Sequence, residues 1–176
     1  MGIYGTDSPK MLVYTIRVAT QLALGWLKPV AVSSLPGVKP FYEVFFFCGT
    51  TDMDSYTHMN NSNFLRIAEL CRWRIFPKAW KLIVAENHAT YSRQIKPFQR
   101  FVVRTSVSAT DNKWLWFKHS FESVKPDANG RPLQYATIHC KAVLKEGSGK
   151  TIRASDYINM SDFNRQLVQI DESKVL

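Results

Sequence analysis

Hydrophobic and polar positions divide the first half of the chain into segments with different periods. Residues 41–48 are almost continuously apolar, which predicts a strand that is buried on both faces. From about Asn61 to Phe76 apolar residues recur at helical spacing, and Pro77 is expected to end the helix. The expected apolar face of this helix consists of Phe64, Leu65, Ala68, Cys71, Arg72 and Ile75. A strand, a polar stretch and a long amphipathic helix are therefore predicted in that order.

Downstream of this helix, apolar and polar residues alternate in three runs, at 101–109, 115–121 and 136–145. Alternation of this kind predicts half-buried strands. Turn residues separate the runs at Asp111-Asn112, Asn129-Gly130 and 147–149. His119 shares the apolar face of the second run and is expected in the core, and a second helix is expected only from about Ser161. The order predicts an α+β domain in which a curved antiparallel sheet wraps around one long helix.

The first 40 residues have a different character. Residues 11–32 are rich in Leu, Val, Ala and Ile, but Arg17 and Lys28 interrupt them, and Gly25 and Pro29 weaken or end a helix. We expect an amphipathic helix that lies either on a membrane surface or against the protein's own domain or a partner subunit. Residues 33–40 contain two prolines and a glycine and are typical of a linker. The expected organisation is an N-terminal segment at 1–40 and a globular domain at 41–176.

Composition limits the classes of partner and site. The formal net charge of +9 favours an anionic partner, which can be nucleic acid, an anionic lipid surface or a phosphorylated small molecule such as coenzyme A. The basic residues form no run, so no nucleic-acid partner is expected. The three cysteines are widely separated and odd in number, which indicates reduced thiols in an intracellular protein. They form no metal-binding spacing, so no metal is expected.

The N-terminal segment also bears on location. Met1-Gly2 with Thr6 fits the myristoylation pattern, and a single acyl chain anchors a protein only marginally. A lone acidic residue, Asp7, among basic ones leaves a mitochondrial leader open. The expected location is therefore the cytoplasm, with membrane association through the N-terminal segment, and mitochondria are the alternative.

Residues 52–64 carry the candidate chemistry. They place Asp54, His58, Asn60 and Asn61 between the apolar strand and the helix. The first N–H groups of a helix have no intrahelical acceptor and can stabilise a developing oxyanion. Asp54 can attack a carbonyl or deprotonate a water, and His58 can orient that water or act as an acid–base partner. The structural alternatives are an Asx turn for Asp54, a structural hydrogen bond for His58 and a helix cap for the asparagines, with Asn61 preferred as the cap.

The spacing Asp-x-Asp-x-x-x-His-x-Asn-Asn-x-x-Phe, followed by Leu65, Glu69 and Arg72, resembles a known signature. It is similar to that of hotdog-fold acyl-CoA thioesterases of the 4-hydroxybenzoyl-CoA thioesterase type and to that of plant acyl-ACP thioesterases. Proteins of the thioesterase superfamily member six kind match more closely, and the resemblance covers roughly residues 41–157. It implies a hotdog fold, Asp54 as the catalytic carboxylate and no cofactor.

The resemblance also implies that an acidic residue at the position of Glu69 can line the site. The alternative for Glu69 is an ion pair with Arg66 or Arg72, which lie three residues away on either side. Two positions depart from the family pattern, because Tyr56 and Thr57 stand where related proteins carry asparagine and glycine. These bulkier residues narrow the loop.

Two functions are therefore open. The first is a hydrolase of lipid metabolism that cleaves a fatty or aromatic acyl-CoA and works as a homodimer or tetramer. The second is a catalytically weak hotdog protein that binds acyl chains or partners at a membrane. A plug formed by Tyr56 or Met59 in the site would favour the second.

Overall fold

The computed structural model describes residues 9–27, 32–33, 41–75, 81–110, 113–145 and 148–151. Its helices are α1 (Pro9–Leu27) and α2 (Asn61–Ile75), and a 3-10 turn, η1 (Thr50–Asp52), lies between the first strands and α2. The strands are β1 (Val32–Ser33), β2 (Phe41–Phe47), β3 (Lys81–Tyr91), β4 (Arg100–Thr110), β5 (Trp114–Pro126) and β6 (Pro132–Lys145).

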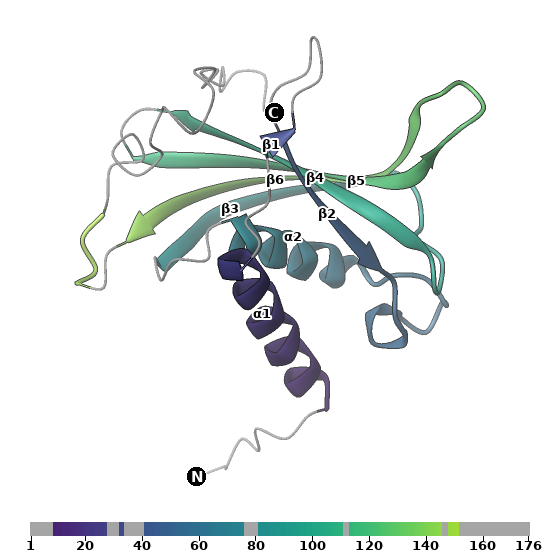
Figure 1. Cartoon of the computed structure of the whole chain (residues 1–176), viewed down its shortest axis with the longest axis horizontal. Helices are drawn as coiled ribbons and strands as arrows, with labels where there is room; N and C mark the ends of the chain where they lie inside the picture. The colour runs from purple at the N-terminus through teal and green to yellow at the C-terminus, as the bar shows by residue number, and fades with distance from the viewer. Residues whose placement is uncertain are drawn as a thin grey trace.

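The six strands form one antiparallel sheet in the order β1-β2-β4-β5-β6-β3. The sheet curves around α2, so that the helix lies against its concave face (Figure 1). This confirms the α+β prediction of a curved sheet around one long helix. β3 was not among the runs predicted by alternation, and it forms one edge of the sheet.

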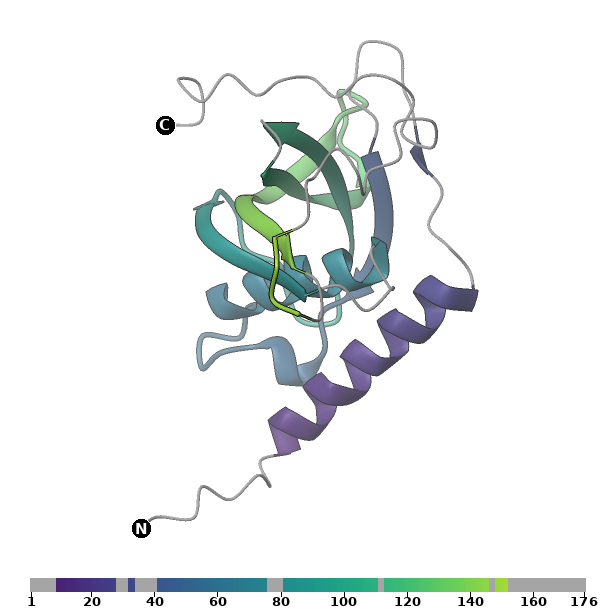
Figure 2. The same ribbon diagram turned by 90° about the vertical axis from the view of Figure 1, so that its left-hand side faces the viewer.

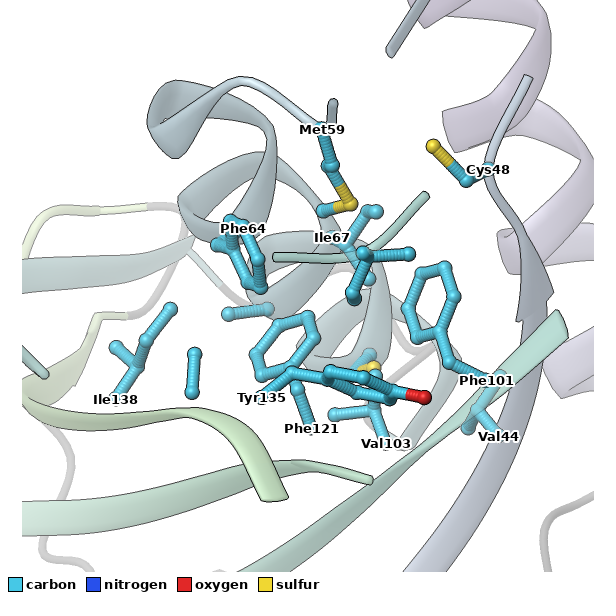
Figure 3. Packing of buried hydrophobic residues seen from close by; sticks show 14 residues of the cluster. Val44, Cys48, Met59, Phe64, Ile67, Phe101, Val103, Phe121, Tyr135 and Ile138 are labelled. Carbon is cyan, nitrogen blue, oxygen red and sulfur yellow. The ribbon is translucent and has the colours of Figure 1, made fainter. Parts of the chain in front are cut away.

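The core lies between α2 and the concave face of the sheet. Phe64 and Ile67 of α2 pack with Phe101 of β4 and Phe121 of β5, and all four are nearly inaccessible to solvent (Figure 3). The predicted apolar face of α2 is wrong at one residue, because Leu65 is 37% exposed. Ile67 takes its place, since it lies on the side of the helix that faces the sheet.

A small polar network is enclosed in this core. Arg72 Nη1 of α2 donates to His119 Nε2 at 3.2 Å, and His119 Nδ1 lies 2.9 Å from Thr105 Oγ1. His119 is fully buried, as predicted. Burial, with the nearby Arg72 charge, holds the pKa of His119 well below its ordinary value. The imidazole is therefore neutral at physiological pH.

Helix α1 lies outside the curve of the sheet and packs against α2 (Figure 2). Of the placements expected for the N-terminal helix, the structure thus shows the one against the protein's own domain. Contact with a membrane stays a prediction. In the described part of the chain, no helix is both long enough and apolar enough to cross a bilayer.

Several predictions fall outside the described residues: the turn at 111–112, most of the linker, the helix from about Ser161 and the modification at Gly2. The predicted turn at Asn129-Gly130 is confirmed. Gly130 adopts φ 73°, a conformation that suits glycine, and its N–H donates to the Asp127 carbonyl at 3.0 Å.

Candidate active site

The segment between η1 and α2 folds into a closed loop. Met53 and Met59 pair as an isolated antiparallel bridge and bring the two stems of the loop together. Inside it, Asp54 N–H donates to the His58 carbonyl at 3.0 Å, and Thr57 N–H donates to the Asp54 carbonyl at 3.3 Å. Thr57 has φ 59°, which a non-glycine residue adopts only where its surroundings hold it. The loop is therefore fixed by its own backbone hydrogen bonds.

The side chains of Asp54 and His58 meet across this loop. His58 Nδ1 lies 2.8 Å from Asp54 Oδ1, and the two side chains are 23% and 19% exposed. Tyr56 N–H also donates to Asp54 Oδ1, at 2.9 Å, so the predicted Asx turn is present as well. A carboxylate oxygen accepts, so we assign the proton to Nδ1, which leaves Nε2 as an acceptor. Asp54 Oδ2 receives no hydrogen bond from any described residue.

The cap of α2 is Asn60, not Asn61 as predicted. Asn60 Oδ1 accepts from Ser62 N–H at 2.8 Å, and the Asn60 carbonyl accepts from Asn63 N–H at 2.9 Å. Asn60 is the cap because its own N–H donates to the Asp52 carbonyl, at 2.9 Å, which keeps it outside the helix. Among the first N–H groups of α2, those of Ser62 and Asn63 are thus already engaged. Asn61 N–H has no acceptor among the described residues.

The foot of the loop contains an ion pair that sequence reasoning missed. Asp52 is 1% exposed, and Arg17 of α1 approaches it with both terminal nitrogens, Nη1–Oδ1 at 2.5 Å and Nη2–Oδ2 at 3.0 Å. Gly49 N–H donates to Oδ2 at 2.9 Å. In the sequence, Arg17 stands out only as an interruption of an apolar helix. The available signal was the presence of a lone guanidinium in that helix and a carboxylate directly after a buried strand, but no spacing rule connects them.

Glu69 contacts α1 and lies away from the Asp54–His58 pair. Tyr14 Oη of α1 donates to Glu69 Oε2 at 2.5 Å, and burial together with this bond raises the Tyr14 pKa. Neither Arg66 nor Arg72 forms the predicted ion pair with Glu69 among the described residues. Arg66 lies over the Tyr14 ring, and Arg72 lies in the core. Glu69 is eight residues into α2 from Asn61, about 12 Å along the axis at 1.5 Å per residue. In a single chain, Glu69 is therefore a contact residue of α1.

A cavity between α1 and α2 adjoins the Arg17–Asp52 ion pair and not the Asp54–His58 pair. It is lined by Val13, Tyr14, Arg17, Thr51, Asp52, Asn63, Arg66, Ile67 and Leu70. Neither Asp54 nor His58 lines it, although both lie on the same loop as Asp52. Asp54 is thus only partly buried and lies outside this cavity.

The three cysteines do not supply a nucleophile. Cys48, Cys71 and Cys140 are buried and form no disulfide. Burial raises the pKa of Cys48 to about 11 and that of Cys71 to about 12, and it also raises the Cys140 pKa. Because the thiolate is the reactive form, these thiols are inert at neutral pH.

Sequence comparison relates the chain to thioesterases. The family model of the thioesterase-like superfamily matches residues 48–159. A probable thioesterase of Saccharomyces cerevisiae is 26% identical over 141 residues, which cover 70% of this chain and 56% of that protein. The chain therefore spans about half the length of this relative.

Solved structures of thioesterases share the architecture. A putative thioesterase from Pseudomonas aeruginosa superposes with a TM-score of 0.58 at 22% identity and covers 68% of this chain and 95% of its own. The 4-hydroxybenzoyl-CoA thioesterase of Pseudomonas sp. strain CBS-3 gives 0.53 at 11% identity, with 66% and 94% covered. These likenesses show the fold, and the predicted hotdog fold is confirmed.

Proposed function

Since this chain belongs to the thioesterase-like superfamily, we propose that it hydrolyses an acyl-CoA thioester to a free acid and coenzyme A, with Asp54 as the catalytic carboxylate. The observation that carries the proposal is the Asp54–His58 pair, held in a closed loop directly before the N-terminus of α2. This arrangement combines a carboxylate, an imidazole and a helix amide, which are the groups that thioester hydrolysis uses.

Asp54 Oδ2 is the reactive atom of the proposal. It receives no hydrogen bond from the described residues, so it can take a proton from water, which then adds to the thioester carbonyl. Alternatively Oδ2 adds to the carbonyl itself and forms a mixed anhydride that water hydrolyses. In both routes the C–S bond breaks and the departing thiolate of coenzyme A takes up a proton.

His58 acts as the auxiliary of Asp54. Its Nδ1–H fixes Oδ1, which orients the carboxylate and leaves Oδ2 for the reaction. Its Nε2 is the acceptor that can hold a water close to the carboxylate. Removal of His58 is therefore expected to affect orientation more than the chemical step.

The amide of Asn61 is the oxyanion donor that remains at α2. Asn60 engages the amides of Ser62 and Asn63, whereas Asn61 N–H has no acceptor among the described residues. The positive end of the helix dipole adds to its effect on a developing negative charge. We therefore assign stabilisation of the thioester oxygen to Asn61 N–H first.

Basic residues beside the loop suit the phosphates of coenzyme A. Met59 N–H donates to the Ile95 carbonyl at 3.0 Å, which places the segment before β4 alongside the loop. Arg93, Lys96 and Arg100 are exposed on or next to this segment. Cationic side chains of this kind bind phosphate groups through charge-assisted hydrogen bonds.

A homodimer, which can double to a tetramer, completes the proposal. β3 is an 11-residue edge strand, and most of its side chains are exposed. An edge of this length normally pairs or is covered. Tyr91 Oη, at the end of β3, donates to the Asn61 carbonyl at 3.3 Å, so a second copy paired along β3 would lie close to the start of α2. Such a partner would complete the enclosure of Asp54, which one chain leaves partly exposed.

The alternative is a weakly catalytic protein that binds acyl chains or partners at a membrane. It draws on the outer side of α1, where Leu12, Ile16 and Leu27 are 64%, 55% and 84% exposed. Apolar residues at helical spacing on an exposed face suit an interfacial helix. Against it, Tyr56 is 81% exposed and Met59 packs in the core, so neither forms the plug that this alternative requires.

A panel of acyl-CoA thioesters tests the proposal. Short-chain, long-chain and aromatic acyl-CoAs are incubated with the full chain, and the release of free thiol is measured. We expect turnover of at least one class. If no class is turned over while an acyl-CoA still binds, the alternative replaces the proposal.

A further inference from the structure

The ion pair at the foot of the loop links α1 to the candidate site. Arg17 donates to both carboxylate oxygens of Asp52, at 2.5 and 3.0 Å, and the Asp52 side chain is 2% exposed. Two parallel hydrogen bonds from a guanidinium fix the orientation of a carboxylate as well as its position. Within the described residues, Arg17 is the only cation paired with Asp52.

Asp52 in turn holds both stems of the loop. Its carbonyl accepts from Asn60 N–H at 2.9 Å and from Asn63 Nδ2 at 2.7 Å, while its Oδ2 accepts from Gly49 N–H at 2.9 Å. Asn60 is the cap of α2, and Asp54 follows Asp52 by two residues. A displacement of Asp52 would therefore move the catalytic carboxylate and the helix N-terminus relative to each other.

The burial of Asp52 makes its position depend on Arg17. An ionised carboxylate away from water is costly unless it is paired and hydrogen-bonded. Without the guanidinium, Asp52 would have to take up a proton or turn towards solvent. Either response would loosen the bonds that join η1 to the start of α2.

We propose that Arg17 is a positioning residue of the candidate active site, which acts through Asp52 on the geometry of Asp54, His58 and Asn61. The inference rests on the proposed function, because it assigns a reaction to Asp54. It makes α1 a part of the active-site scaffold. A displacement of about 1 Å in a catalytic geometry can lower the rate by two orders of magnitude. Loss of Arg17 should therefore lower mainly kcat.

The test compares Arg17→Gln with a matched control on the same helix. Val13→Ala removes an apolar contact at the α1–α2 cavity and leaves the ion pair intact. We expect Arg17→Gln to lower kcat by about tenfold or more with KM changed less than about threefold, and Val13→Ala to keep kcat within about twofold. Arg17→Lys should recover part of the loss, because an ammonium keeps the charge without the two-pronged geometry.

A structural readout keeps the inference separate from the proposed function. The carbon-bound Hε1 proton of His58 does not exchange with water and gives an NMR resonance that is sensitive to the bond between Nδ1 and Asp54, and His58→Gln assigns this resonance by its loss. We expect this resonance in the parent protein and in Val13→Ala, and its shift or loss in Arg17→Gln. This readout requires no turnover, so a protein that hydrolyses no thioester would overturn the proposed function and still report on the role of Arg17.

The double variant Arg17→Gln/Asp52→Asn covers the case in which Arg17→Gln alone does not fold. It removes both charges together and so leaves no unpaired buried charge. If it is folded, it should still show reduced kcat or an altered His58 resonance. The inference is overturned if folded Arg17→Gln or the folded double variant keeps both the parental kcat and the parental resonance. It is equally overturned if Val13→Ala lowers kcat as much as Arg17→Gln does, because the effect would then belong to the docking of α1 in general.

Discussion

Two carboxylates two residues apart have opposite environments. Asp52 is enclosed and neutralised by a guanidinium, whereas Asp54 faces an imidazole and keeps one oxygen without a donor among the described residues. Residue type alone does not distinguish them. The surroundings make the first a structural anchor and the second the candidate reactive group.

The short-range part of the site was predictable from the sequence. The Asx turn of Asp54 and the closeness of His58 depend on residues at most four apart, and a motif specifies such contacts. The cap was misassigned by one residue, because Asn60 and Asn61 have equal intrinsic preference and the choice depends on the bond from Asn60 N–H to Asp52. The contacts of Arg17 and Tyr14 with residues 35 and 55 positions away could not be predicted, since only tertiary packing brings them together.

His58 should contribute less than Asp54 to turnover. We expect His58→Ala to lower kcat by about tenfold, below the hundredfold lower range for loss of an acid–base group, because Asp54 and the Asn61 amide remain. His139→Ala, on the outer face of β6, serves as the control and should leave kcat unchanged. A loss in His58→Ala as large as that of Asp54→Asn would show instead that His58 is the base.

At the scale of elements, alternation identified the strands that are buried on one face and missed the edge. β4, β5 and β6 were located because their inward side chains are apolar. β3 gave no alternating run for two reasons. A bulge between Val84 and Glu86 shifts by one residue which side chains point inward, and the edge position leaves most side chains exposed. A strand with an interrupted period and polar side chains gives no clear alternation.

Mutations should distinguish the role of the α1 side that packs against α2 from the role of its exposed side. Deletion of residues 1–33 removes Arg17 and uncovers the side of α2 that α1 covers, so we expect the melting temperature to fall. Leu12→Gln/Ile16→Gln changes only exposed side chains and should keep the melting temperature. If α1 also binds membranes, this pair should reduce co-sedimentation with anionic vesicles. A deletion variant with parental stability would contradict the structural role of α1.

For the whole molecule, the buried imidazole predicts a dependence of stability on pH. The pKa of His119 is held well below 6.5 in the folded state. Below about pH 6.5 the unfolded chain binds a proton that the folded state does not bind, so the free energy of unfolding falls as the pH falls. One such group contributes a slope of up to about 1.4 kcal/mol per pH unit.

Replacement of this imidazole should reduce that slope. Denaturant unfolding of His119→Gln between pH 7 and about pH 5 is expected to show a weaker pH dependence than the parent, although its stability at pH 7 is lower because bonds to Arg72 and Thr105 are lost. His139→Gln is the control. The His139 pKa is also lowered, but this side chain is only partly buried and should contribute less. Equal slopes for parent and His119→Gln would contradict the neutral buried state.

The exposed edge of β3 predicts how copies of the chain assemble. If β3 pairs with a second copy, charges placed along its exposed edge should oppose the pairing. We expect light scattering at micromolar concentration to give a dimer or tetramer for the parent and a shift towards monomer for Ala85→Lys/Thr90→Lys. Ser120→Lys, in the middle of the sheet, should assemble as the parent does. A monomeric parent would contradict the proposed homodimer.

Turnover and binding measured side by side in Asp54→Asn test the proposed role of Asp54 most directly. This substitution keeps the shape of the side chain and an acceptor for Tyr56 N–H, but it removes the charge that either route needs. On the thioester that the parent cleaves best, we predict a fall in kcat of at least about a hundredfold, with acyl-CoA affinity within about threefold, since the basic residues assigned to coenzyme A are untouched. An Asp54→Asn protein as active as the parent would contradict the assignment of Asp54 as the catalytic carboxylate.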